Sequence, residues 1–173
     1  MTVAPVAPDV DVSNSGVGSG HVTRLIYGRH LRVLLVEADP DAAAAFADAA
    51  EESVLDVRVE VAIGVDAAVT SLQRSMEPRR RRTPPDIIVS SLSVPHSHQL
   101  LTFLRDDSRF DLLRVVVLAA ESDARLERRS FALGAAGHLV APRRDYERVA
   151  LVHALPDFMP RARAAHAHAH IHR

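Results

Sequence analysis

Residues 31–40 read LRVLLVEADP, and this stretch holds the change from strand to helix that decides the fold. Its first part is an almost unbroken run of Leu and Val, which is typical of a short strand buried on both faces of a parallel sheet. Asp39 and Pro40 follow as an N-cap and a first helical residue, because a carboxylate accepts unpaired helix N–H groups and proline has none to satisfy. The stretch therefore predicts a strand that turns directly into a helix.

The same alternation of strand and helix continues along the chain. Strands are expected at 31–37, 54–62, 86–92, 112–120 and 137–140, and helices at 40–52, 64–76, 100–106, 122–134 and 144–155. Alternating polarity within 54–62 places that strand near a sheet edge. Short connections imply right-handed βαβ units. The expected fold is α/β: a doubly wound five-stranded parallel sheet, flavodoxin-like order 2-1-3-4-5, with helices on both faces.

The helix over 122–134 carries the clearest end signals. Ser122 is expected to be its N-cap and Gly134 its C-terminal stop. Helical periodicity predicts that Phe131 and Leu133 point inward, which leaves the arginines of this helix exposed.

Outside this pattern lie two terminal segments and one basic loop. Residues 1–29 are expected to form a flexible arm, 30–158 a single domain, and 159–173 a disordered tail rich in Ala, Arg and His. Residues 77–85 are expected to be a loop, because prolines interrupt them and Arg79 to Arg82 repel one another. Such a run is typical of a solvated loop, since no aromatic residues that would stack on nucleic acid are interleaved with it.

Composition excludes several kinds of chemistry. The chain has 173 residues, a net charge of −1 and no Cys, and all its basic residues other than His are Arg. Disulfides, thiolate sites and lysine Schiff bases are therefore excluded. Near-neutral charge gives no general attraction to nucleic acid or to anionic membranes. We expect a cytoplasmic protein, because no secretory signal and no membrane span are visible.

In such a sheet a site lies beyond the carboxyl ends of the strands. Four segments that end there, LLVEADP, PDIIVSSLSVP, RVVVLAAES and LGAAGHLVAP, resemble the receiver domains of bacterial response regulators, in the right order and at the right spacing. The resemblance covers about residues 31–155. It implies a site for Mg²⁺ and a phosphoryl group formed by Glu37, Ala38, Asp39, Ser91, Ala119 and Ala141.

Carried over position by position, the resemblance implies that this site is degenerate. Glu37 matches the first acidic residue of the family, but Ala38 stands where the second would be. Ser91 replaces the phosphorylated Asp, Ala119 the hydroxyl residue and Ala141 the Lys. Mg²⁺ prefers several oxygen ligands, and a transferring phosphoryl group needs its charge neutralised. We therefore expect no phosphoryl chemistry, no enzymatic activity and no cofactor.

The resemblance also implies where a partner would bind. His138 occupies the position at which the family has an aromatic residue whose rotamer reports phosphorylation. The contact face usual for the family is expected to present Arg125, Arg128, Arg129, Arg143, Arg144 and Tyr146. This face is basic, so an acidic protein partner is expected, and the same face could form a homodimer. The favoured hypothesis is a pseudo-receiver that regulates another protein by contact.

Two other classes of function stay open from the sequence. One is a phosphorelay receiver with an unorthodox acceptor, for which Ser91 would be the candidate. The other is a metal-handling protein that uses His166, His168, His170 and His172, whose alternate spacing can bring neutral imidazoles together around Zn²⁺ or Ni²⁺. A hydrolytic site built from His96, His98, Ser91 and Glu37 is not favoured, because no nucleophile-elbow or oxyanion motif accompanies them.

Overall fold

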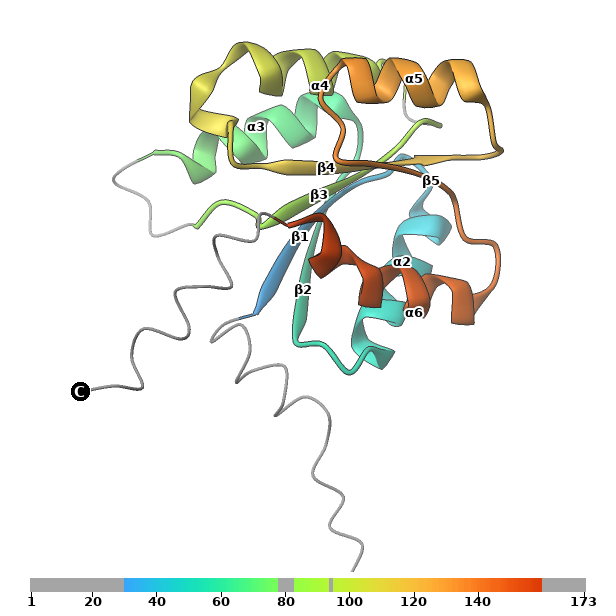
Figure 1. Cartoon of the computed structure of the whole chain (residues 1–173). Coiled ribbons are helices and arrows are strands. Elements are labelled where there is room, and N and C mark those ends of the chain that lie inside the picture. The colour runs from blue at the N-terminus through green and yellow to red at the C-terminus, as the bar shows by residue number, and fades with distance from the viewer. Residues whose placement is uncertain (1–29, 78–82, 94, 160–173) are drawn as a thin grey trace, which may run out of the picture.

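The computed structural model describes residues 30–77, 83–93 and 95–159. Its five strands are β1 (Leu31–Val36), β2 (Val57–Ala62), β3 (Ile87–Ser91), β4 (Arg114–Ala119) and β5 (Gly137–Val140). All pair in parallel, in the order β2-β1-β3-β4-β5, and Figure 1 shows β2 and β5 at opposite ends of the sheet. The predicted topology is confirmed, and β2 is an edge strand as expected.

Helices cover both faces of this sheet. They are α2 (Pro40–Glu52), α3 (Val65–Ser75), α4 (Ser97–Asp106), α5 (Ala124–Ala132) and α6 (Asp145–Ala154), with short 3-10 helices at η1 (Ser108–Phe110) and η2 (Leu155–Phe158). In Figure 1, α2 and α6 lie below the sheet, and α3, α4 and α5 lie above it. No helix within these described ranges is long and apolar enough to cross a membrane.

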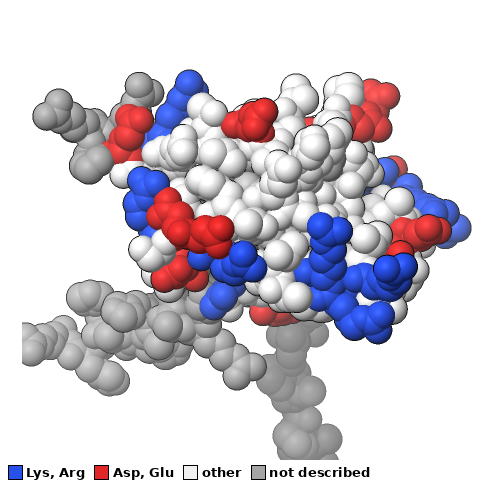
Figure 2. All heavy atoms as spheres, turned by 90° about the horizontal axis from the view of Figure 1, so that it is seen from above, with Lys and Arg blue, Asp and Glu red and all other residues white. Residues whose placement is uncertain are grey.

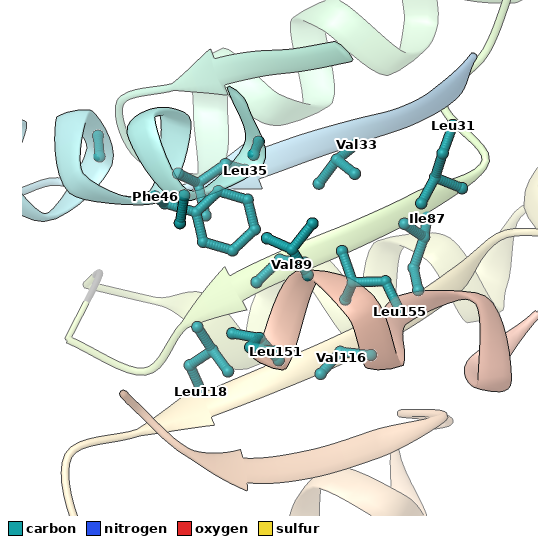
Figure 3. Packing of buried hydrophobic residues seen from close by; sticks show 14 residues of the cluster. Leu31, Val33, Leu35, Phe46, Ile87, Val89, Val116, Leu118, Leu151 and Leu155 are labelled. Carbon is teal, nitrogen blue, oxygen red and sulfur yellow. The ribbon is translucent and has the colours of Figure 1, made fainter. Parts of the chain in front are cut away.

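Each face has its own hydrophobic core. Below the sheet, Phe46 of α2 and Leu155 of η2 pack against Val33 and Val89, as Figure 3 shows. Above it, Leu72 and Leu100 pack against Leu34. The central strands β1 and β3 are buried on both faces, which explains why their sequences are almost continuously apolar. With few aromatic residues in the chain, Leu, Val, Ile and Ala supply most of this buried surface.

The helix ends follow the sequence signals with one correction. Asp39 is the N-cap of α2, and its carboxylate accepts from the Asp41 N–H at 2.9 Å, with Pro40 as first helical residue. Ser122 is not the N-cap of α5. Asp123 takes that place, since its carboxylate accepts from the N–H groups of both Arg125 (2.7 Å) and Leu126 (3.3 Å). Gly134, with φ of +97°, stops that helix as predicted.

The inward face of α5 differs from the prediction. Phe131 is 47% exposed, and the residue buried against the sheet is Ser130. Leu126, Ser130 and Leu133 are spaced four and three residues apart, so they share one side of the helix and Phe131 lies about 100° away from Ser130. The prediction for Leu133 is confirmed, because it packs against the upper core.

The last described residues lie against the lower core. Phe158, the predicted last residue of the domain, and the next residue, Met159, both pack against it. Helix α4 starts at Ser97, three residues before the expected start, and buries Ser97 itself. The N-terminal arm, Arg79 to Arg82 and the histidines of the tail lie outside the described residues.

Candidate functional site

The register of the sheet brings the expected site residues to one edge. Val36 is level with Ser90, so Glu37 follows β1 beside Ser91 at the end of β3. Ser91 is level with Leu118, and Ala119 ends β4 next to it. Ala141 follows β5 and donates its N–H to the Ala119 carbonyl at 2.7 Å. The carboxyl ends of the four neighbouring strands thus meet where the sequence placed the site.

The two carboxylates at this edge are engaged by the backbone of their own loop. Glu37 Oε1 accepts from the N–H groups of Ala38 at 2.8 Å and Asp39 at 3.0 Å. The Asp39 carboxylate caps α2. Both interactions neutralise negative charge with N–H dipoles at a helix start, so neither carboxylate needs a metal ion to be satisfied.

The remaining positions of the edge supply little polar chemistry. Ser91 is only 5% exposed, and its hydroxyl accepts from the Ser93 N–H at 3.2 Å. Ala119 is 2% exposed and Ala141 is partly buried, and each contributes only a methyl group. A transferring phosphoryl group would find no side-chain cation and no second hydroxyl at these positions.

Metal-binding groups do not cluster in the parts of the chain that the structure describes. Among residues 30–77, 83–93 and 95–159, no group of three or more His, Cys, Asp or Glu side chains is placed to hold a metal ion. The candidate ligands His166, His168, His170 and His172 lie beyond these ranges.

A shallow pocket lies near the carboxyl ends of β2 and β3. Its volume is about 220 Å³, and its lining includes Ile63, Gly64, Pro95 and Gln99. His96 also lines it and is the N-cap of α4, with φ of +61°, so its backbone is in the left-handed region that non-glycine residues rarely adopt. Ser91 is not among the residues that line this pocket, and the His96 side chain contacts that of Gln99 at 3.4 Å.

The expected strand at 86–92 and helix at 100–106 leave His98 in the loop between them, and the structure corrects this position. His98 lies in the first turn of α4, and burial lowers its pKa below the ordinary value, with Arg129 and His138 lowering it further. Its Nε2 atom is buried and has no hydrogen-bond partner among the residues that the structure describes. The sequence signal was present, since the start of α4 at Ser97 makes position 98 helical, but the helix was predicted to begin later.

His138 lies at the centre of a small polar cluster above β5. It is level with Val117 of β4, so both side chains lie on the upper face. Its Nδ1 lies 3.1 Å from Ser130 Oγ, and that hydroxyl donates to the Leu126 carbonyl at 3.0 Å. Because the hydroxyl hydrogen is already used, Ser130 Oγ is free to accept from Nδ1 of His138. The other ring nitrogen, Nε2, is buried and has no hydrogen-bond partner among the described residues.

The predicted contact face is exposed. Arg125, Arg128 and Arg129 are exposed on α5, and Arg143 and Arg144 are exposed on the loop after β5. Tyr146 is 63% exposed and accepts a hydrogen bond from the Arg144 guanidinium at 3.1 Å. In Figure 2, which views α3, α4 and α5 from above, a broad uncharged area is bordered by both arginine and acidic side chains, and several of the arginines gather toward the lower right.

Comparison with solved structures supports the fold assignment. The chain is similar to the phosphorylated cyanobacterial phytochrome response regulator RcpA, with a TM-score of 0.64, 19% identity and coverage of 75% of this chain and 94% of that one. It is also similar to RPA3017 of R. palustris, a response regulator in red light signalling (TM-score 0.66, 17% identity, 73% and 92% covered). A third match is the chemotaxis response regulator CheY4 of Vibrio cholerae (TM-score 0.60, 19% identity, 72% and 98% covered).

Sequence comparison adds nothing to these matches. No protein-family model matches the chain, and no curated protein matches it.

Proposed function

We propose that this chain, which has the fold of the response regulator receiver domains, is a pseudo-receiver that acts in signal transduction by protein contact and without a phosphorylation cycle. One observation carries the proposal. The edge that would hold Mg²⁺ and a phosphoryl group presents Ala119 and Ala141, a buried Ser91, and a Glu37 carboxylate turned onto backbone N–H groups.

Electrostatics support this reading of the site. Mg²⁺ is usually held by one or two carboxylates together with phosphate oxygens, in octahedral geometry. Here Ala38 offers no carboxylate, and the Glu37 and Asp39 carboxylates already accept from N–H groups. The charge of a phosphoryl group would meet no cation at Ala141. Without these groups, a chain with this fold can still bind a partner protein through its surface, and that contact is the function we propose.

The exposed arginines indicate the kind of partner. Arg125, Arg128 and Arg129 on α5, together with Arg143 and Arg144, form a basic surface, which we call the arginine face. Two copies of this face would repel one another across a twofold axis, so an acidic partner suits it better than a second copy of this chain.

An apolar hollow adjoins the arginine face. A pocket of about 380 Å³ between β5 and α6 is lined by Val140, Pro142 and Leu151, among others. Val140 is 49% exposed at the edge strand β5. A partner could therefore add an apolar anchor to its acidic groups, which is the usual combination in specific protein interfaces.

The test is the binding of a phosphoryl analogue. Amide resonances of the full chain are followed by NMR while Mg²⁺ and BeF₃⁻ are added together, and no shift is expected around Ser91. The matched control carries Ala38→Asp, Ser91→Asp, Ala119→Thr and Ala141→Lys, which restores the group types that phosphoryl transfer needs. That variant should respond if it folds, which its melting curve reports.

A response of the unmodified chain would contradict the proposal and favour a receiver with an unorthodox acceptor. Incubation with acetyl phosphate, followed by mass spectrometry of the unmodified chain and of Ser91→Ala, would then show whether Ser91 is the acceptor.

A further inference from the structure

The free edge of the sheet at β2 has a charge pattern that fits a second copy of itself. Within the described residues β2 pairs only with β1, and Figure 1 shows it at one end of the sheet. Its sequence from 57 to 61 is Val-Arg-Val-Glu-Val, in which valines alternate with one positive and one negative residue. Charges on edge strands usually prevent pairing with other chains, unless the opposed charges attract.

The backbone of β2 fixes which residues can pair outward. At the two ends of the β1–β2 ladder, the Leu31 N–H donates to the Asp56 carbonyl and the Glu37 N–H donates to the Ala62 carbonyl. In a parallel ladder every second residue faces its neighbour, so the even-numbered residues of β2 face β1. The N–H and C=O groups of Val57, Val59 and Val61 therefore point to the free edge.

One antiparallel register satisfies both the backbone and the charges. With Val59 opposite Val59 of a second copy, the odd-numbered valines form the hydrogen-bonded pairs and Val57 lies opposite Val61. Arg58 of each copy then lies opposite Glu60 of the other copy, and the twofold axis relates the two pairs. Registers centred on Val57 or Val61 also match the backbone, but they fit the charges less well. Centred on Val61, the register places Ala62 opposite Glu60 and Gly64 opposite Arg58. Centred on Val57, it places Arg58 opposite Asp56, which lies before the strand and already pairs with His30 at 2.6 Å, and it leaves Glu60 opposite Val54.

The side chains sort onto the correct faces for this pairing. Val57 and Val59 lie on the lower face, where they pack against the core, and Val61 continues that row but is 42% exposed. Arg58 and Glu60 lie on the upper face, where Glu60 accepts from the Ser71 hydroxyl at 2.5 Å. A carboxylate has two oxygens and accepts several donors, so the bond from Ser71 is compatible with a further bond from an arginine.

We propose that two copies of this chain associate through antiparallel pairing of their β2 strands, centred on Val59, with reciprocal Arg58–Glu60 pairs that fix the register. The two sheets become continuous across the twofold axis. Exposed Val61 gains an apolar neighbour in Val57 of the second copy. The arginine face lies at the other end of the sheet and stays accessible, so the dimer would present that face twice.

The test is a charge exchange read out by sedimentation of the full chain from micromolar to millimolar concentration. The unmodified chain is expected to dimerise. Arg58→Glu and Glu60→Arg should each weaken dimerisation about tenfold or more, because each places like charges opposite one another. An equimolar mixture of the two variants should dimerise again, and so should the chain that carries both changes. Arg128→Glu on α5, at the other end of the sheet, is the matched control and should dimerise like the unmodified chain.

A second pair of variants tests the backbone part of the proposal. Val61→Pro removes an N–H that the fold leaves pointing outward, so it should block dimerisation and leave the monomer folded. Val61→Ala keeps that N–H and should retain dimerisation. The proposal is wrong if the unmodified chain is monomeric at all concentrations, if either charge variant dimerises like the unmodified chain, or if the mixture fails to restore the dimer.

Discussion

The ring of Phe158 lies directly against Gly137, so closely that a methyl group added to Gly137 would come within 2.5 Å of the ring carbon Cε1. Gly137 starts β5, and Phe158 ends the 3-10 helix that follows α6. The absence of a side chain at the start of β5 therefore lets the end of the domain close over the lower core.

The first prediction follows from this contact. Gly137→Ala should lower the free energy of unfolding by about 1–3 kcal/mol, as overpacked sites usually do. Chemical denaturation measures the change. Phe158→Ala should also destabilise the protein, but the double variant should cost clearly less than the sum of the two, because the clash is gone. Additive effects would show that the ring moves aside and that Gly137 is needed for another reason.

Much of the fold was predictable because its signals are local. The apolar run 31–36 and the Asp39 cap depend on residues that are neighbours in sequence, and both were identified correctly. The Gly137–Phe158 contact was not predictable, because it depends on how a chain end returns to a strand. Phe131 was wrongly predicted to point inward, because the side of α5 that faces the sheet depends on tertiary packing. The helical spacing was compatible with burial of Phe131, but the structure buries Ser130, whose hydroxyl lies 3.1 Å from His138 Nδ1 on the neighbouring strand.

In the candidate site, too, some features could be predicted from the sequence and others could not. The carboxyl ends of parallel strands must meet at one edge, so Glu37, Ser91 and Ala119 could be placed together from strand positions alone. The use of the Glu37 carboxylate by its own loop could not be predicted, because it depends on a side-chain rotamer. His98 was misplaced because an error of three residues in a helix start turned a helical position into a loop position.

The second prediction concerns the buried charge of Asp86. Its side chain is 2% exposed and accepts from the Arg32 backbone N–H at 2.9 Å and from the Arg32 guanidinium at 3.3 Å. Arg32→Met should destabilise the protein by roughly 3 kcal/mol, because the buried carboxylate loses its ion pair with the Arg32 guanidinium. The control, Arg105→Met, breaks an exposed pair with Asp106 and should change the free energy of unfolding far less. Equal effects in denaturant titrations would contradict this account.

The third prediction is a pH dependence that His98 causes. Its pKa is lowered in the folded state, mainly by burial and further by Arg129 and His138. The unfolded chain therefore binds a proton at a higher pH than the folded chain, so stability falls as the pH drops below the ordinary histidine value of about 6.5. The loss should level off only below the folded-state pKa.

The variant that tests this is His98→Gln. Its free energy of unfolding should decrease less between about pH 7.5 and about pH 5.5 than that of the unmodified chain. His153→Gln, which changes an exposed histidine of α6, should keep the full pH dependence. An unchanged slope for His98→Gln would show that other groups cause the acid sensitivity.

The fourth prediction defines the end of the domain. Removal of residues 161–173 should leave the melting temperature almost unchanged, and so should removal of residues 1–24, because neither segment has the composition to bury much apolar surface. A chain that ends at Leu155 loses Phe158 and Met159, both of which pack against the lower core, and should melt several degrees lower. A large effect of either terminal deletion would show that the segment docks on the domain.

The fifth prediction tests the arginine face. Arg125 and Arg129 are exposed on α5, so changing both to Glu should alter the free energy of unfolding by only about 0.5 kcal/mol per residue or less. Proteins captured from the native host by the full chain are first identified, and one acidic partner is purified. Its affinity is then measured at two salt concentrations for the unmodified chain, the double variant and the Arg74→Glu control. The double variant should bind more weakly and lose most of the salt dependence, because attraction between opposite charges is what salt screens. The control should behave like the unmodified chain.

If the double variant folds and binds with unchanged affinity, the interface lies elsewhere, and the loops around Ser91 and His96 become the next surface to change.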